Sequence, residues 1–180
     1  MSPDEAGSDL TPEPVLLFRA GPLLCGLPLP DVVETLRPLP TRALAGTPAC
    51  VRGVCVLRGA PVPVLDAAVL LTGSAAEAAR FLSVRAGRGP VALATGPVLG
   101  VVEMPPPAAR GATLPAAPGP ALPAATDSAG ATAAPLRARA AGASAAGLAV
   151  HGDEPLLLLS GATVVPDAVA ASLDDHAYAS

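Results

Sequence analysis

Residues 53–71 read GVCVLRGAPVPVLDAAVLL, and the rest of the chain is organised around this stretch. Two apolar runs, VCVL and VPVL, flank the charged point Arg58-Gly59, which is the pattern of a β-hairpin with mostly buried strands. Glycine at position 59 supplies the positive φ that a tight turn commonly needs, so the turn is expected to hold the Arg58 guanidinium away from the apolar strands. Asp66 precedes AAVLL and predicts an N-cap followed by a short helix.

The chain contains an internal repeat. Residues 81–106 overlay residues 15–40 without a gap at an offset of 66 positions, and residues 147–165 overlay residues 53–71 at an offset of 94. The match lies in the apolar pattern more than in identical letters. Each half, at about 55 residues, is too small to bury a core alone. We therefore expect a mainly β fold in which two small sheets, packed or closed as barrels, share one interface.

The two copies differ at the turn of this hairpin. Leu57-Arg58-Gly59 in the first copy corresponds to His151-Gly152-Asp153 in the second, so only one copy carries the arginine. An exposed arginine on a rigid turn suits contact with another protein. The plainer interpretation is a solvated charge, which any hairpin turn can carry.

Composition changes along the chain predict the domain boundaries. Residues 1–14 hold four acids and three prolines and are expected to form a disordered acidic tail. The globular part is expected over residues 15–166, with segments of the first barrel at about 15–71 and of the second at about 80–166.

Two further segments are predicted from composition. Residues 107–146 consist almost entirely of Ala, Pro, Gly, Ser and Thr, which indicates a flexible linker with a possible helical part over 136–146. Residues 167–180 are expected to form a C-terminal helix or tail, because Asp167 can cap a helix over 168–178.

Composition also restricts the function. Hydrophobic residues make up 51% of the chain and aromatic residues 2%, so the core must consist of Val, Leu and Ala. All eleven basic residues are arginines, and none is interleaved with aromatic side chains, which argues against nucleic-acid binding. No apolar span approaches the length of a membrane helix, and the acidic N-terminus is unlike a signal peptide. A cytoplasmic protein without membrane insertion is therefore expected.

No set of side chains predicts catalysis. The three cysteines, Cys25, Cys50 and Cys55, lie in or beside apolar runs, which favours buried thiols over disulfides. The two histidines, His151 and His176, are not near a Cys-x-x-Cys spacing or a nucleophile, and the chain has no lysine for a phosphate-binding loop. We therefore expect no enzyme activity, no cofactor and no metal.

Four segments together resemble the CheW-like family of chemotaxis coupling proteins. They are VLLFRAGPLLCGLPLPDVVETLRPLP (15–40), TPACVRGVCVLRGAPVPVLDAAVLL (47–71), FLSVRAGRGPVALATGPVLGVVEMP (81–105) and GLAVHGDEPLLLLSGATVV (147–165). The most specific part is GVCVLRGAPVPVLD, which is similar to the family signature Gly-hydrophobic-x-Asn-Leu-Arg-Gly-x-x-x-Pro-hydrophobic-hydrophobic-Asp. Val56 stands where the signature has Asn. The resemblance implies two small five-stranded SH3-like β-barrels packed together.

The same resemblance implies a non-catalytic adaptor. Proteins of this family join the cytoplasmic tips of methyl-accepting chemoreceptors to the regulatory domain of a CheA-type histidine kinase, in receptor arrays at the inner face of the membrane. Transferred to this sequence, the resemblance places the partner-binding residues at Arg58 and Glu34, with neighbours Val33, Arg52, Leu57 and Gly59. Two alternatives stay open: a regulatory module of another chemosensory pathway such as surface motility, and a β-barrel module that binds a small ligand.

Overall fold

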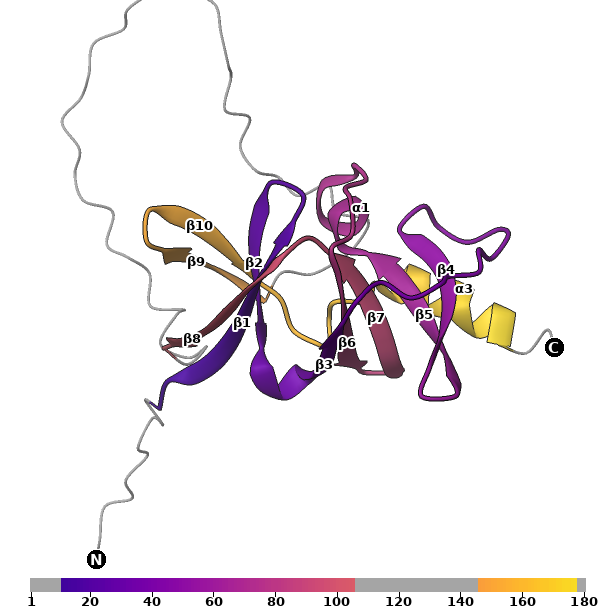
Figure 1. Ribbon diagram of the computed structural model, residues 1–180, viewed down its shortest axis with the longest axis horizontal. Helices are drawn as coiled ribbons and strands as arrows, with labels where there is room; N and C mark the ends of the chain where they lie inside the picture. Colours follow the sequence, from indigo (N-terminus) through magenta and orange to yellow (C-terminus); the bar gives the residue numbers. More distant parts are fainter. Residues whose placement is uncertain (1–10, 106–145, 178–180) are drawn as a thin grey trace, which may run out of the picture.

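Two five-stranded β-sheets form the framework of the protein in a computed structural model, which describes residues 11–105 and 146–177 (Figure 1). Sheet A has the strand order β8-β1-β2-β10-β9, and sheet B has the order β3-β6-β7-β5-β4. Neighbouring strands are antiparallel except for the parallel pairs β2–β10 and β5–β7. The strands are β1 (Glu13–Ala20), β2 (Leu23–Pro28), β3 (Val32–Leu36), β4 (Val51–Leu57), β5 (Ala60–Asp66), β6 (Arg80–Ala86), β7 (Gly89–Thr95), β8 (Val98–Met104), β9 (Gly147–His151) and β10 (Glu154–Leu158).

Three short helices accompany the sheets in the part of the chain that the structure describes. They are the 3-10 helix η1 (Leu29–Asp31) and the α-helices α1 (Ala67–Thr72) and α3 (Asp167–Ala177). Helix α3 agrees with the predicted C-terminal helix. Within the described residues, no helix has the length and apolar character needed to cross a membrane.

The internal repeat is present in the strand register. Val15 pairs with Pro28 between β1 and β2, and the residues 66 positions later, Phe81 and Ala94, pair in the same way between β6 and β7. The hairpins β4–β5 and β9–β10 correspond equally at the offset of 94. The repeat predicted from the apolar pattern is therefore a structural repeat of five strands.

The two repeats exchange strands. Strand β8 and the hairpin β9–β10, from the second repeat, join β1 and β2 in sheet A, whereas β6 and β7 join the first repeat's β3, β4 and β5 in sheet B. The sheets therefore do not divide at the boundary between the repeats, unlike the expected barrel segments 15–71 and 80–166. The physical reason is that each hairpin forms its parallel pair with a strand of the other repeat, so neither half can complete a sheet alone.

Each sheet is open in its strand pairing. Strands β8 and β9 are the edges of sheet A, and β3 and β4 are the edges of sheet B. No pairing between edge strands closes either sheet within the described residues, so the closed SH3-like barrel stays a prediction. A single backbone bridge between Arg42 and Val54 adds a short piece of the β3–β4 connection to the outer side of β4.

The core has three parts that explain the continuous apolar runs in the sequence. Leu16 and Phe18 of β1 face a large cluster shared by both sheets, whereas Val15 and Leu17 face a smaller cluster within sheet A. Strand β6 is divided similarly between the shared cluster and a second small cluster within sheet B. Because alternate residues of a strand point to opposite faces, a strand that lies between two clusters has apolar side chains on both faces.

The N-terminal strand corrects one sequence-based boundary. Residues 13 and 14 were expected in the disordered tail, but Glu13 and Pro14 belong to β1 and pair with Met104 and Glu103 of β8. Strand β8 pairs with this segment through its backbone, which composition does not reveal. Residues 1–10, nearly all of the linker 107–146 and most of the helix predicted over 136–146 lie outside the described residues.

Candidate functional site

Arg58 lies in a two-residue turn with unusual backbone geometry. Leu57 and Ala60 form the last pair of the β4–β5 hairpin, and the two residues between them, Arg58 and Gly59, have φ values of 52° and 82°. Positive φ at both central positions is the geometry of a type I′ turn, which matches the twist of the strands. Arg58 is the one described non-glycine residue with positive φ. The hairpin thus holds an arginine in a conformation that side chains usually avoid.

The Arg58 side chain forms a bidentate ion pair with Glu34. Nε donates to Oε1 at 2.9 Å and an Nη2 hydrogen donates to Oε2 at 3.0 Å, which is the planar geometry that guanidinium and carboxylate favour. The Arg58 side chain is 74% exposed and that of Glu34 is 27% exposed. The hydrogen bonds that Arg58 donates to Glu34 raise the pKa of Arg58 further above its usual value, so the guanidinium stays charged at every physiological pH.

The ion pair connects the two opposite edges of sheet B. Glu34 is on β3, and Arg58 follows β4, which lies at the other end of the strand order. Leu36 of β3 and Leu57 of β4 both pack against the small apolar cluster of sheet B. The sheet is therefore curved enough to bring its two edge strands together. Leu57, next to Arg58 in the chain, packs against the apolar cluster and so holds the end of the hairpin in place. Gly59 is exposed beside it.

Val33 adds an apolar group next to this pair. The pairing of β3 with β6 shifts in register between Val32 and Glu34, so Val33 occupies a β-bulge. Bulges re-aim side chains at sheet edges, and the Val33 side chain is 44% exposed. Val33, Glu34 and the Arg58 turn thus form a surface with one apolar and two charged groups.

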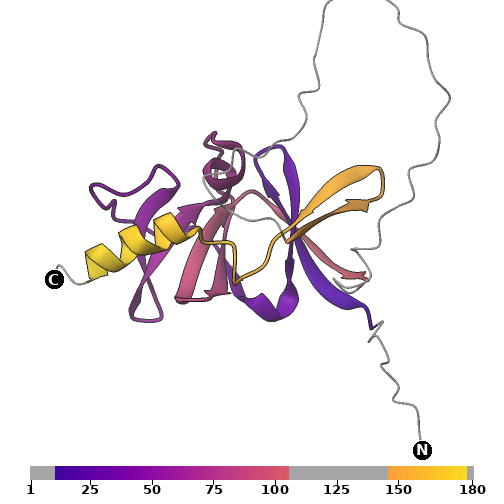
Figure 2. The same cartoon turned by 180° about the vertical axis from the view of Figure 1, so that it is seen from behind.

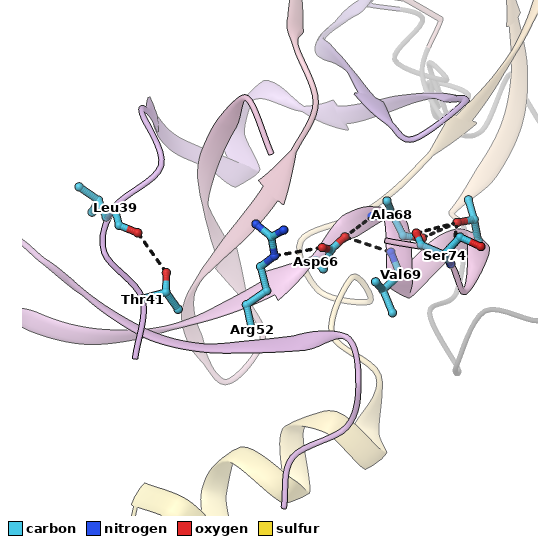
Figure 3. A network of polar contacts seen from close by, with 8 residues as sticks. Leu39, Thr41, Arg52, Asp66, Ala68, Val69 and Ser74 are labelled. Carbon is cyan, nitrogen blue, oxygen red and sulfur yellow. Dashed lines mark hydrogen bonds and ion pairs between the residues drawn. The ribbon is translucent and has the colours of Figure 1, made fainter. Parts of the chain in front are cut away.

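Arg52 has a different position, shown in Figure 3. Its Nε lies 3.0 Å from Oδ2 of Asp66, whose side chain is only 5% exposed. The other carboxylate oxygen of Asp66 accepts hydrogen bonds from the backbone N–H groups of Ala68 and Val69, each at 3.0 Å. The predicted N-cap is confirmed, and Arg52 neutralises the buried capping carboxylate. A role of Arg52 in partner contact stays a prediction.

The equivalent turn of sheet A carries no such site. The positions that correspond to Glu34 and Arg58 are Gly100 and Gly152, so the second copy has neither charge. Sheet A instead has an ion pair between Arg19 and Glu154, in which both carboxylate oxygens accept from the guanidinium. The hydrogen bonds from Arg19 lower the pKa of Glu154. Sequence reasoning missed this pair because its members are 135 positions apart.

A cavity of about 470 Å³ lies between α3, β5 and the β6–β7 turn. Its walls are largely apolar, and Arg88 and Asp167 are the charged residues that line it. Sequence reasoning gave no sign of this cavity, because its walls come from three segments that only folding brings together. The apolar residues that line it are Pro61, Pro63, Ala86, Pro90, Val91, Ala162, Val165, Ala170 and Leu173.

Burial raises the pKa of each of the three cysteine thiols above its usual value. All three cysteines are buried and unpaired, and burial raises the pKa of Cys25 to about 12. A thiol with so high a pKa is not a nucleophile at neutral pH. Within residues 11–105 and 146–177, no group of three or more His, Cys, Asp or Glu side chains could hold a metal ion. The chemistry that the exposed groups offer is recognition through hydrogen bonds, charge and apolar contact.

Comparison with known proteins identifies the protein family of this chain. A family model described as "CheW-like domain" matches residues 14–133, more than half of the chain, so the protein belongs to the CheW-like domain family. The family predicted from the four sequence segments is confirmed.

Among solved structures, the chain is similar to the scaffolding protein TtCheW from Thermoanaerobacter tengcongensis. The two share 18% sequence identity with a TM-score of 0.59, over 86% of this chain and 92% of that chain. This likeness shows a common fold. The comparison with curated proteins gave no match.

Proposed function

We propose that this protein is a non-catalytic adaptor of chemotaxis signal transduction, which couples chemoreceptor tips to the regulatory domain of a CheA-type histidine kinase. The observation that carries the proposal is the Arg58–Glu34 pair, held on a type I′ turn at the surface of a CheW-like domain. Such an adaptor would act at the cytoplasmic side of a receptor array.

The geometry of the pair fits recognition better than stabilisation. Exposed ion pairs contribute little to folding, and a non-glycine residue with positive φ costs stability. Glu34 uses two of the five N–H donors of the guanidinium, so donors are left for an acidic or carbonyl group of a partner. Val33, Leu57 and Gly59 would form the apolar and backbone surroundings of that contact.

A binding experiment tests the proposal. The full-length protein is titrated separately with a chemoreceptor cytoplasmic fragment and with a CheA regulatory domain, both from the same genome, by isothermal calorimetry. We expect the wild type to bind both and Arg58→Glu to bind the receptor fragment at least tenfold more weakly. Arg80→Glu, at an exposed arginine outside the pair, is the matched control and should bind like the wild type.

Two outcomes would contradict this function. A wild-type protein that binds neither component excludes the adaptor role. An equal loss in Arg58→Glu and Arg80→Glu would indicate a general charge effect and exclude the specific contact at the turn.

The cavity of about 470 Å³ favours a second candidate, a module that binds a small ligand, because its volume and apolar walls are typical of such sites. A rise in Tm with a small molecule, in a protein that binds no kinase, would support this candidate over the adaptor.

A further inference from the structure

The two sheets carry grooves at equivalent positions. We call the cavity beside α3 groove B. A second cavity, groove A, has a volume of about 210 Å³ and lies on sheet A. Pro155 and Leu157 of groove A correspond to Pro61 and Pro63 of groove B at the offset of 94. The residues that line groove A are Pro22, Leu23, Leu24, Leu148, Glu154, Pro155 and Leu157.

The β1–β2 turn extends this equivalence. Pro22, Leu23 and Leu24 of groove A correspond to Arg88, Gly89 and Pro90 of groove B at the offset of 66. The internal symmetry of the fold therefore relates two walls of each groove: strand β10 replaces β5, and the β1–β2 turn replaces the β6–β7 turn.

The grooves differ in what covers them. Helix α3 lies against sheet B, where Ala170 and Leu173 line groove B and Val169 reaches the shared core. Figure 2 shows this helix across sheet B, whereas the described residues place no helix over the β9–β10 hairpin. Leu148 on β9, which lines groove A, is left 65% exposed. Among residues 11–105 and 146–177, a helix covers groove B and none covers its copy, groove A.

We propose that groove A binds an amphipathic helix of a partner protein, in the position that α3 takes on sheet B. The apolar spacing of such a helix would follow that of α3, where residues three positions apart, Ala170 and Leu173, face the groove. This interaction goes beyond the proposed adaptor function, because it uses sheet A and none of the groups around Arg58.

The charges around groove A indicate which residues should flank the apolar stripe of the partner helix. The charged group that lines groove A is the carboxylate of Glu154, and Asp153 is exposed next to it in the turn. Arg19 balances only one of these two charges. A helix with lysine or arginine beside its apolar stripe therefore complements the groove.

Two other occupants fit less well. A volume of about 210 Å³ is below the range of roughly 300–1,000 Å³ that is typical of small-molecule pockets. Among the described helices of a second copy, α3 is the longest, and its Val169 and Leu173 are already packed against its own core.

Titration of the 15N-labelled full-length protein with a synthetic helical peptide tests the proposal. The peptide carries leucines at positions i, i+3, i+4 and i+7 and lysines on the flanks, and a scrambled peptide of equal composition serves as control. We expect saturable amide shift changes confined to the β1–β2 turn, β9 and β10. Leu148→Asp should weaken binding at least tenfold, and Leu148→Gln should act in the same direction if the aspartate variant does not fold.

Val56→Asp is the matched control, because Val56 on β4 is 67% exposed and lies outside both grooves. Equal binding of the scrambled peptide, shift changes at groove B, no saturation at millimolar peptide, or an equal loss in Val56→Asp would each overturn the proposal. Dimerisation of the protein through groove A, detected by sedimentation, would also overturn it in favour of a second copy.

Discussion

Arg58 donates two hydrogen bonds to Glu34 although these residues belong to opposite edges of sheet B. The curvature that brings them together comes from the apolar cluster against which Leu36 and Leu57 both pack. The packing of the core thus brings the two charged side chains together at the surface. Mutation of either residue can therefore be tested separately for its effect on the free energy of unfolding and for its effect on binding.

The first prediction concerns charge reversal. Arg58→Glu and Glu34→Arg should each weaken receptor binding at least tenfold, and the double variant should recover the ion pair but not the binding. The reason is that the swapped pair places the carboxylate on the exposed turn, where a partner's acceptor group would be repelled. Calorimetry measures the binding, and NMR of the arginine Nε–H reports whether the pair forms. Full binding by the double variant would show that the pair matters only for local structure.

The second prediction concerns the turn glycine. Gly59→Ala should lower the free energy of unfolding by about 1 kcal/mol, because alanine is strained at a φ of 82°. Steric clash contributes nothing, since an added Cβ meets no atom within 4 Å. Urea unfolding monitored by circular dichroism measures the change. Gly87→Ala is the control, since its φ is not in the left-handed region and its nearest contact is 3.8 Å away, so it should be close to neutral.

The third prediction concerns the helix cap. Asp66→Ala removes two hydrogen bonds to the first turn of α1 and leaves Arg52 without its carboxylate. Loss of an N-cap costs about 0.5–2 kcal/mol, so the free energy of unfolding should fall by at least about 0.5 kcal/mol. Asp66→Asn keeps an acceptor oxygen and should be destabilised less. A stability of Asp66→Ala equal to that of the wild type would show that the cap and ion pair are energetically neutral.

The fourth prediction concerns the thiols and alkaline pH. Because burial raises the pKa of Cys25 from 9.0 to about 12, the folded protein keeps a proton that the unfolded chain loses in this range. Stability from this group is complete below pH 9 and should decline as the pH rises toward 12. Ellman's reagent at pH 8 should label none of the three cysteines in the folded protein and all three in 6 M urea. Rapid labelling of the native protein would contradict their burial.

Much of the local structure could be predicted from the sequence. The hairpins, the arginine turn, the Asp66 cap, the internal repeat and the C-terminal helix all depend on residues close in the chain, whose side-chain periodicity and turn chemistry are visible directly. The start of β1 was wrong by two residues, since Glu13 and Pro14 are held by a distant strand, β8. Local composition contains no information about that contact.

The candidate site was predicted only in part. Arg58 and Glu34 were both selected through the family resemblance, yet the hydrogen bonds between them required the curvature of sheet B. Arg52 was selected as a neighbour of these two residues, and the structure pairs it with Asp66. Neither groove could be predicted, because their walls combine a turn, a distant strand and, on sheet B, a helix.

The sequence by itself determined a repeated, aromatic-poor β protein of the CheW-like family, with an arginine at the turn of one of its two equivalent hairpins. Apolar periodicity and turn residues act over a few positions, so they can be read directly. Only the tertiary structure decided which repeat supplies which strand and which charges meet. The parallel pairs β2–β10 and β5–β7 form between segments far apart in the chain, where the burial of a shared core, and no local preference, selects the partner.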